Sequence, residues 1–158
     1  MEEALAKVGV SDLRERSIAS LSGGQRQKVA IASIIALKPK ILVLDEPTGE
    51  LDPRSSRQIF SLLKELNEEQ GITVILIEQK IMLLCEFARQ LAVLSKGRIV
   101  RQGETRDVLS HADELQALGV NCPRVTTLSR MLSERTGTEQ PVCINLDEAE
   151  NMVRRLIP

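Results

Sequence analysis

The sequence predicts an α/β protein with a mostly parallel sheet and a small helical appendage at its C-terminal end. Short apolar runs at 41–44 and 72–77 are typical of buried strands, and they alternate with segments of helical periodicity. Strands that alternate with helices form parallel sheets with right-handed crossovers. A length of 158 residues is enough for about one domain with a sizeable core.

The predicted elements follow from apolar periodicity and from helix-breaking residues. Asp52 and Pro53 have the character of an N-cap and a first-turn proline, and Gly71 ends the helix that they open. The uninterrupted apolar run at 41–44 predicts a strand that is buried on both faces. In chain order we expect a helix at 3–8 ended by Gly9, a helix from Gly23 to Pro39, a strand at 41–44, a helix at 53–71, a strand at 72–77, a helix at 81–88, and strands at 91–94 and 98–101 with a break at Gly103.

Composition narrows the function classes. The hydrophobic content is 42%, the charged content is 27% and the formal net charge is −1, so nothing indicates general attraction to nucleic acid or to an anionic membrane. No apolar stretch is long enough to span a bilayer, and Met1 is followed by two glutamates. We therefore expect a cytoplasmic protein that reaches a membrane only through a partner. Three scattered cysteines are expected to be reduced packing residues.

A glycine-rich turn precedes the second predicted helix, with the sequence Leu21-Ser22-Gly23-Gly24-Gln25. Serine can cap a helix, glycines allow close approach of the backbone, and free N–H groups at a helix start favour an anion. Ser-Gly-Gly alone would more often be a simple N-cap and loop. With Leu21 before it, Gln25 after it and an apolar helix behind it, the turn favours phosphate binding.

Two adjacent acids, Asp45 and Glu46, end the strand at 41–44. Ligands of open α/β sheets bind beyond the carboxyl ends of strands, which is where both acids fall. Asp45 is a candidate to hold Mg²⁺ through water, and Glu46 is a candidate to orient or deprotonate a water that attacks a γ-phosphate. A merely polar strand end would explain one acid more easily than both.

These motifs together resemble the ATP-binding cassette (ABC) ATPases. The resemblance is carried by LSGGQ at 21–25, ILVLDEP at 41–47, GELDP at 49–53 and LSKGRIV at 94–100 with Gly103, in matching order and spacing. It covers roughly residues 1–110 and corresponds to the later half of a nucleotide-binding domain. TVILIEQK at 73–80 and LGVNCPRV at 118–125 resemble the energy-coupling-factor (ECF) branch, which imports vitamins and transition-metal ions.

The resemblance implies a partial P-loop NTPase fold with a RecA-like core. Residues 1–40 would belong to the helical signature subdomain, 41–110 to the C-terminal half of the core, and 111–158 to the appendage. The cofactors would be ATP and Mg²⁺. The partners would be a second nucleotide-binding subunit, in a homo- or heterodimer, and a transmembrane coupling protein that holds the chain at the inner face of the cell membrane.

The family's residue roles carry over by position. Ser22, Gly23, Gly24 and Gln25 would contact the γ-phosphate of ATP held by the opposite subunit. Asp45 would be the magnesium-side acid of the Walker B strand, and Glu46 the catalytic base. Asp52 would lie in the loop that communicates between the two sites of a dimer, while also capping its helix.

Two departures from the family pattern qualify these roles. Gln79 stands where the family has a switch histidine, and a neutral amide can hydrogen-bond but cannot become cationic. No Gly-x-x-x-x-Gly-Lys-Ser/Thr phosphate loop occurs in the 158 residues. The leading hypothesis is therefore a truncated or split domain that acts in trans on ATP held by a partner. The alternative is a catalytically inactive remnant that serves as an interaction module. A third option, an ABC protein of chromosome maintenance or translation, is not favoured, because such proteins need long coiled coils or a second cassette and the sequence has neither.

Overall fold

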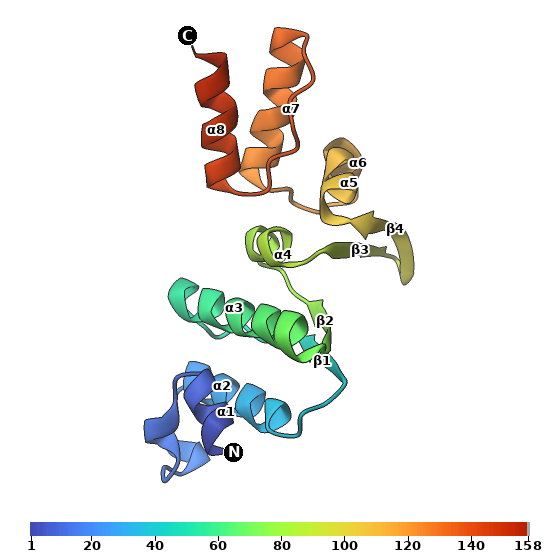
Figure 1. Cartoon of the computed structure of the whole chain (residues 1–158). Coiled ribbons are helices and arrows are strands. Elements are labelled where there is room, and N and C mark those ends of the chain that lie inside the picture. The colour runs from blue at the N-terminus through green and yellow to red at the C-terminus, as the bar shows by residue number, and fades with distance from the viewer. Residues whose placement is uncertain (158) are drawn as a thin grey trace. The chain divides into compact units, whose positions relative to one another are not determined.

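The computed structural model describes residues 1–157, and its contacts divide the chain into two units, Met1–Gln79 and Lys80–Pro158 (Figure 1). The α/β class with parallel strands and C-terminal helices is confirmed. The expected domain boundaries at 40 and 110 stay predictions. Among the described residues, no helix is both long and apolar enough to cross a membrane.

The first unit is a helical segment followed by a strand–helix–strand motif. Its strands pair in parallel, from Ile41 opposite Thr73 to Asp45 opposite Ile77, and α3 connects them, as parallel pairing requires. Its elements are α1 (Glu2–Lys7), the short 3-10 helices η1 (Ser11–Leu13) and η2 (Ile18–Ser20), α2 (Gly23–Ile35), β1 (Ile41–Asp45), α3 (Pro53–Gln70) and β2 (Thr73–Ile77).

Helix α3 has both of the predicted end signals. The Asp52 carboxylate accepts hydrogen bonds from the backbone N–H groups of Arg54 and Ser55, each at 3.0 Å, and Pro53 occupies the first helical position. Gly71 ends the helix in the left-handed conformation, with φ of 67°. The apolar side of α3 then packs into the core of the unit, which includes Leu5, Ile31, Leu42, Leu44, Ile59, Leu62, Leu66 and Ile72.

One prediction for β1 is wrong: the strand is buried on one face only. Leu42 and Leu44 are 2% and 6% exposed, whereas Ile41 and Val43 are each 60% exposed. Successive side chains of a strand point to opposite faces, and within the described residues the helices cover only the face of Leu42 and Leu44. An apolar run therefore did not distinguish one covered face from two.

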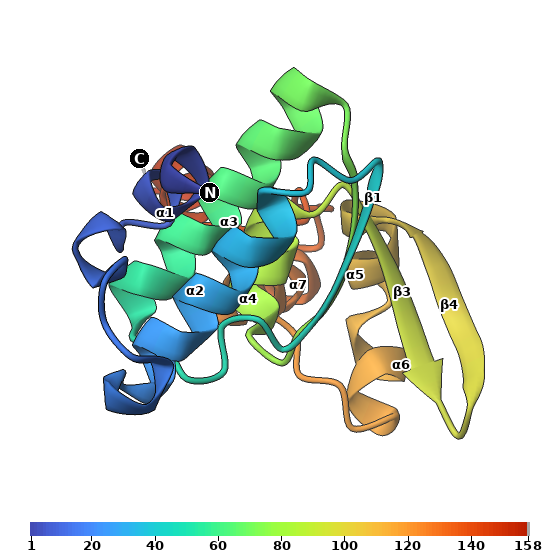
Figure 2. The ribbon, with the colours of Figure 1, turned by 90° about the horizontal axis from the view of Figure 1, so that it is seen from below.

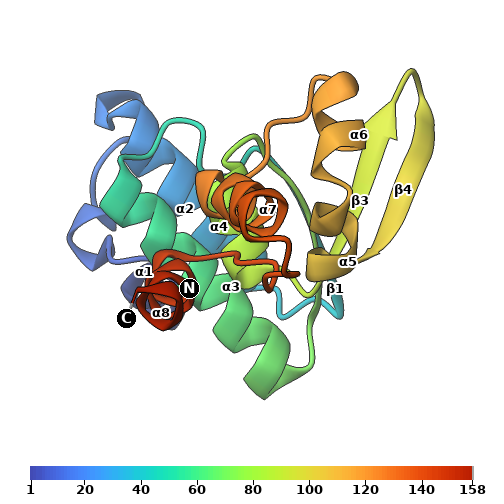
Figure 3. The same ribbon diagram turned by 90° about the horizontal axis from the view of Figure 1, so that it is seen from above.

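The second unit begins with α4 (Ile81–Phe87) and an antiparallel hairpin of β3 (Gln90–Ser95) and β4 (Arg98–Glu104), seen edge to edge in Figure 2. Lys96 and Gly97 form its turn, both with positive φ. The predicted break at Gly103 is wrong, because Gly103 pairs with Leu91 inside β4. Helix α5 (Thr105–Ser110) packs on this hairpin, and α6 (Ala112–Ala117) follows it (Figure 3).

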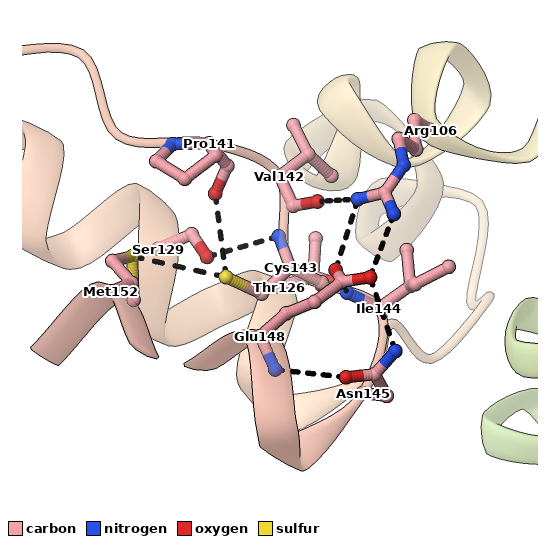
Figure 4. Close-up of polar contacts among 10 residues, drawn as sticks. All are labelled: Arg106, Thr126, Ser129, Pro141, Val142, Cys143, Ile144, Asn145, Glu148 and Met152. Atoms are coloured by element: carbon pink, nitrogen blue, oxygen red, sulfur yellow. Dashed lines mark hydrogen bonds and ion pairs between the residues drawn. The ribbon is translucent and has the colours of Figure 1, made fainter. Parts of the chain in front are cut away.

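Helices α7 (Arg124–Thr136) and α8 (Leu146–Leu156) close the second unit. Hydroxyls on α7 hold the segment that leads to α8. Thr126 Oγ1 donates to the Cys143 carbonyl at 2.7 Å, and Ser129 Oγ accepts from the Cys143 N–H at 3.2 Å (Figure 4). Ser133 Oγ accepts from the Gln140 N–H at 2.8 Å. These bonds pair backbone groups of a segment that forms no helix or strand hydrogen bonds of its own.

The three cysteines all lie in the second unit as free thiols. Cys85 and Cys143 are buried and Cys122 is half-buried. Burial raises the pKa of Cys85 to about 12, so its thiol stays protonated at physiological pH. The prediction of reduced cysteines that fill the core is consistent with this arrangement for Cys85 and Cys143.

Candidate functional site

The glycine-rich turn forms the N-terminus of α2. Ser22 is the N-cap: its Oγ accepts from the Gln25 N–H at 3.2 Å, and the Gln25 side-chain oxygen accepts from the Ser22 N–H at 3.0 Å. This reciprocal capping box fixes the start of the helix. Gly23 and Gly24 occupy its first turn, where N–H groups have no intrahelical acceptor and the helix dipole favours an anion.

The two glycines lie where the loop after β1 approaches the start of α2. A Cβ placed on Gly23 would lie 2.6 Å from Glu50 Oε2, and one on Gly24 would lie 3.2 Å from the Glu50 carbonyl oxygen and 3.3 Å from Leu51 Cδ2. The loop after β1 therefore lies directly against the start of α2. A larger residue at position 24 would press on the loop backbone, whereas one at position 23 would displace the flexible Glu50 side chain.

The acid pair lies at the carboxyl end of β1. Asp45 is the last residue of the strand, and Glu46 extends the pairing because its N–H donates to the Ile77 carbonyl at 2.8 Å. Glu46 has φ of 45°, which is the left-handed region that non-glycine residues rarely adopt. Both acids are exposed, so their carboxylates are accessible from solvent.

Gln79 lies beside Glu46, because β1 and β2 are parallel and end at the same edge. The Gln79 side-chain amide donates to Glu46 Oε1. Glu78 supports this contact through two hydrogen bonds: one carboxylate oxygen accepts from Thr48 Oγ1, and the other accepts from the Gln79 N–H at 2.8 Å. The structure thus brings Glu46 and Gln79 together across 33 positions of sequence.

Three residues of this site were missed from the sequence: Gln27, Thr48 and Glu78. Gln27 hydrogen-bonds the backbone at both Glu46 and Glu50, at 2.8 and 3.0 Å. Glutamine, threonine and glutamate are common surface residues, and no local pattern distinguishes these three from others of their type. Their contacts depend on how β1, β2 and α2 meet.

Asp52 has the capping role that its sequence position predicts. Hydrogen bonds from Ser55 and from the Arg54 backbone lower the pKa of its carboxyl from the ordinary value. Its carboxylate accepts hydrogen bonds from the first turn of α3, and the residue lies at the end of the loop that follows Glu46. Any role in communication between two sites stays a prediction.

The donor set fits a magnesium ion that is held together with a nucleotide. Among residues 1–157, no group of three or more His, Cys, Asp or Glu side chains could hold a metal by itself. Mg²⁺ commonly takes one or two carboxylates and completes its shell with waters and substrate phosphates. Asp45 would supply one such carboxylate.

Comparisons with known proteins show which proteins the chain is similar to. A sequence model described as ABC transporter matches residues 1–49. The energy-coupling factor transporter ATP-binding protein EcfA2 of Bacillus cereus is 41% identical over 140 residues, which is 88% of this chain and 48% of that protein. Most of the chain matches the ATPase domain of ABC transporters.

Solved structures agree with this match. CbiO1 of Clostridium perfringens, part of the ABC transporter complex cbiONQ, matches with a TM-score of 0.61 and 33% identity, covering 81% of this chain and 51% of that one. A dimeric cassette in a post-hydrolysis state with ADP and Pi matches with a TM-score of 0.59 and 37% identity, covering 66% and 45%. The chain spans about half the length of the curated relatives that it matches.

Proposed function

We propose that this chain is an ATP-binding subunit, or a part of one, of an ECF-type importer, and that it contributes the signature turn and the Walker B acids to a composite ATP site. The observation that carries the proposal is the arrangement of the capped turn at 22–25 against the loop that follows Asp45 and Glu46. The likeness to EcfA2 over 88% of the chain supports the ECF branch. The transported solute would be a vitamin or a metal ion.

The signature turn would act on ATP that another subunit holds. The N–H groups of Gly23 and Gly24, with the Ser22 hydroxyl and the Gln25 amide, would donate to the γ-phosphate. Gln25 can donate from its Nε2 while its Oε1 keeps the capping bond from the Ser22 N–H. The 158 residues contain no phosphate loop, and a partner would supply that cradle and its lysine.

The acid pair would serve the hydrolysis step. Asp45 would hold Mg²⁺ through water, and Mg²⁺ would neutralise charge on the β- and γ-phosphates. Glu46 would accept a proton from the attacking water while the water oxygen bonds to the γ-phosphorus and the bond between that phosphorus and ADP breaks. Gln79 would orient the Glu46 carboxylate by the hydrogen bond that joins them.

The proposed composite site implies which partners the chain would need. A composite site requires a second nucleotide-binding subunit, identical or different, and the dimeric cassette among the solved relatives is consistent with that arrangement. Coupling to transport requires a transmembrane protein. The chain would therefore lie at the inner face of the membrane as a peripheral subunit.

Replacement of Glu46 tests the proposal. In a complex reconstituted with a partner that holds ATP, Glu46→Gln should lower the hydrolysis rate by about 100-fold or more, because an amide cannot accept the proton. Glu69→Gln, a change at an exposed glutamate of α3, is the matched control and should leave the rate unchanged. An unchanged rate in Glu46→Gln would contradict the catalytic role.

A second candidate function is an interaction module without catalysis. The observation that favours it is Gln79, whose neutral amide stands at the switch position and occupies Glu46 Oε1. In that case the complex would form and transport would not depend on Glu46. The same Glu46→Gln experiment separates the two functions.

A further inference from the structure

The side chain of Gln27 joins the signature helix to the loop that carries Glu46. Its Nε2 donates to the Glu46 carbonyl at 2.8 Å, and its Oε1 accepts from the Glu50 N–H at 3.0 Å. The nitrogen and the oxygen of one side-chain amide are therefore both hydrogen-bonded, to the first and last residues of the segment 46–50. Gln27 is half-buried and lies in the second turn of α2.

The Glu46 backbone needs this kind of support. Its φ of 45° is unfavourable for a residue with a Cβ and persists only where neighbouring contacts hold it. Three hydrogen bonds do so: the Glu46 N–H donates to the Ile77 carbonyl, and the Glu46 carbonyl accepts from the Gly49 N–H and from Gln27. Of these, only the Gln27 bond comes from a side chain.

The same loop also packs against the start of α2. A Cβ on Gly23 or on Gly24 would meet Glu50 at 2.6 or 3.2 Å. Gln27 lies about one turn after these glycines, on the helix that they begin. The signature turn, the Gln27 amide and the segment 46–50 therefore form one continuous contact.

We propose that Gln27 is a positioning residue that couples the signature turn at 22–25 to the Glu46 carboxylate. Its two side-chain hydrogen bonds go to backbone groups at the ends of the segment 46–50, so it would act on the reaction through Glu46. It sets the direction of the Glu46 side chain by fixing the backbone from which that side chain leaves, and it transmits movement of α2 to that backbone. When the signature turn engages a phosphate, the Glu46 of the same chain is held in its working orientation. The inference rests on the proposed function.

The contact itself can be tested without nucleotide, on the full chain. Gln27→Met keeps a similar volume and removes both hydrogen bonds. Amide hydrogen exchange followed by NMR should be about tenfold faster at Glu50 and Gly49 in this variant, because their shared support is lost. Amides of β2, such as that of Ile75, should be unchanged and report that the fold is intact. Unchanged exchange at Glu50 would overturn the inference.

The control is Gln58→Met, which changes an exposed glutamine of α3 for which the described part of the chain has no side-chain hydrogen bond. It should exchange like the unmodified chain. Gln27→Glu is the partial variant: its carboxylate still accepts from Glu50 but cannot donate to the Glu46 carbonyl. It should preserve protection at Glu50 and lose it at Gly49.

Kinetics separate positioning from general support of the fold. In the reconstituted complex, Gln27→Met should lower kcat about tenfold with KM unchanged, because the phosphate contacts of the signature turn remain. If Glu46→Gln abolishes hydrolysis while Gln27→Met hydrolyses normally, the inference is wrong and the proposed function stands. If neither change affects hydrolysis, the proposed function is wrong, and amide exchange alone decides whether the Gln27 contact exists.

Discussion

At the scale of single residues, the hydrogen-bond partner of the Glu46 carboxylate is a neutral amide. Gln79 donates a hydrogen bond to it, and Glu78 holds the Gln79 backbone in place. An amide does not titrate, so the charge of the Gln79 side chain does not depend on pH. A histidine at the same position would titrate at a pH of about 6.5 and could donate from a cationic ring.

Gln79→His should therefore make hydrolysis by the reconstituted complex depend on pH. We expect the variant to gain a sigmoidal change of kcat centred near the pKa of histidine, about 6.5, that the unmodified complex lacks. Steady-state rates across that range are the measurement. Identical profiles would show that residue 79 does not act on the reacting carboxylate.

At the scale of elements, each helix end in the first unit has a local cause. Ser22 caps α2 through a capping box, Asp52 caps α3, and Gly71 ends α3 in the left-handed region. The Gly71 position isolates one physical effect. A Cβ added there would meet no atom within 4 Å, so only backbone strain opposes a side chain.

Gly71→Ala should lower the free energy of unfolding by about 1–2 kcal/mol, which is the cost of the left-handed region for an ordinary residue. Gly71→Asn should cost less, because asparagine tolerates that region. Urea titration followed by circular dichroism measures both. Equal stability of the three chains would mean that the end of α3 rearranges to remove the strain.

In the second unit, an ion pair ties α5 to the start of α8. Arg106 donates to both carboxylate oxygens of Glu148, at 2.7 and 3.0 Å, and to the Val142 carbonyl at 2.7 Å (Figure 4). Glu148 also accepts from the Ile144 N–H and from Asn145. The Arg106 hydrogen bonds, followed by those of Ile144 and Asn145, lower the pKa of Glu148 from its usual 4.5.

This lowered pKa predicts an acid-dependent stability. The stabilising contribution is complete above pH 4.5, the usual pKa, and is lost as pH falls through the lower pKa of the folded protein. The melting temperature should therefore fall more steeply below pH 4.5 in the unmodified chain than in Glu148→Gln, which is already weakened at neutral pH. Thermal melts at several pH values test this. Parallel curves would contradict it.

At the scale of the whole molecule, one sheet face is left open. Ile41, Val43, Ile75 and Ile77 lie on the same side of the β1–β2 pair and are 51–60% exposed. Contiguous exposed apolar residues of this kind mark association surfaces or aggregation sites. The sheet of two paired strands is therefore expected to associate through this face.

Val43→Thr with Ile75→Thr should reduce self-association while preserving the fold, because threonine keeps the β-branched shape and changes only the exposed side. Sedimentation velocity over a concentration series up to ~100 μM, with circular dichroism as the control of folding, is the measurement. A purely monomeric unmodified chain over that range would contradict the expectation.

The sequence by itself determined the elements and the candidate motifs. Helix caps such as Ser22 and Asp52 depend on bonds within three residues, and strand and helix periods are local, so both can be identified without a structure. The order of the motifs then identified the family. The Gly103 error had the same local origin: a glycine that breaks a pattern in sequence can still pair within a strand.

Only the tertiary structure decided which faces are covered and which distant groups meet. The exposure of Val43 depends on the layers that surround β1, and a run of apolar letters does not report their number. The bonds from Gln27 to Glu46 and from Gln79 to Glu46 span 19 and 33 positions. Such contacts are non-local: they exist only once α2, β1 and β2 are packed, and packing is set by all of their side chains together.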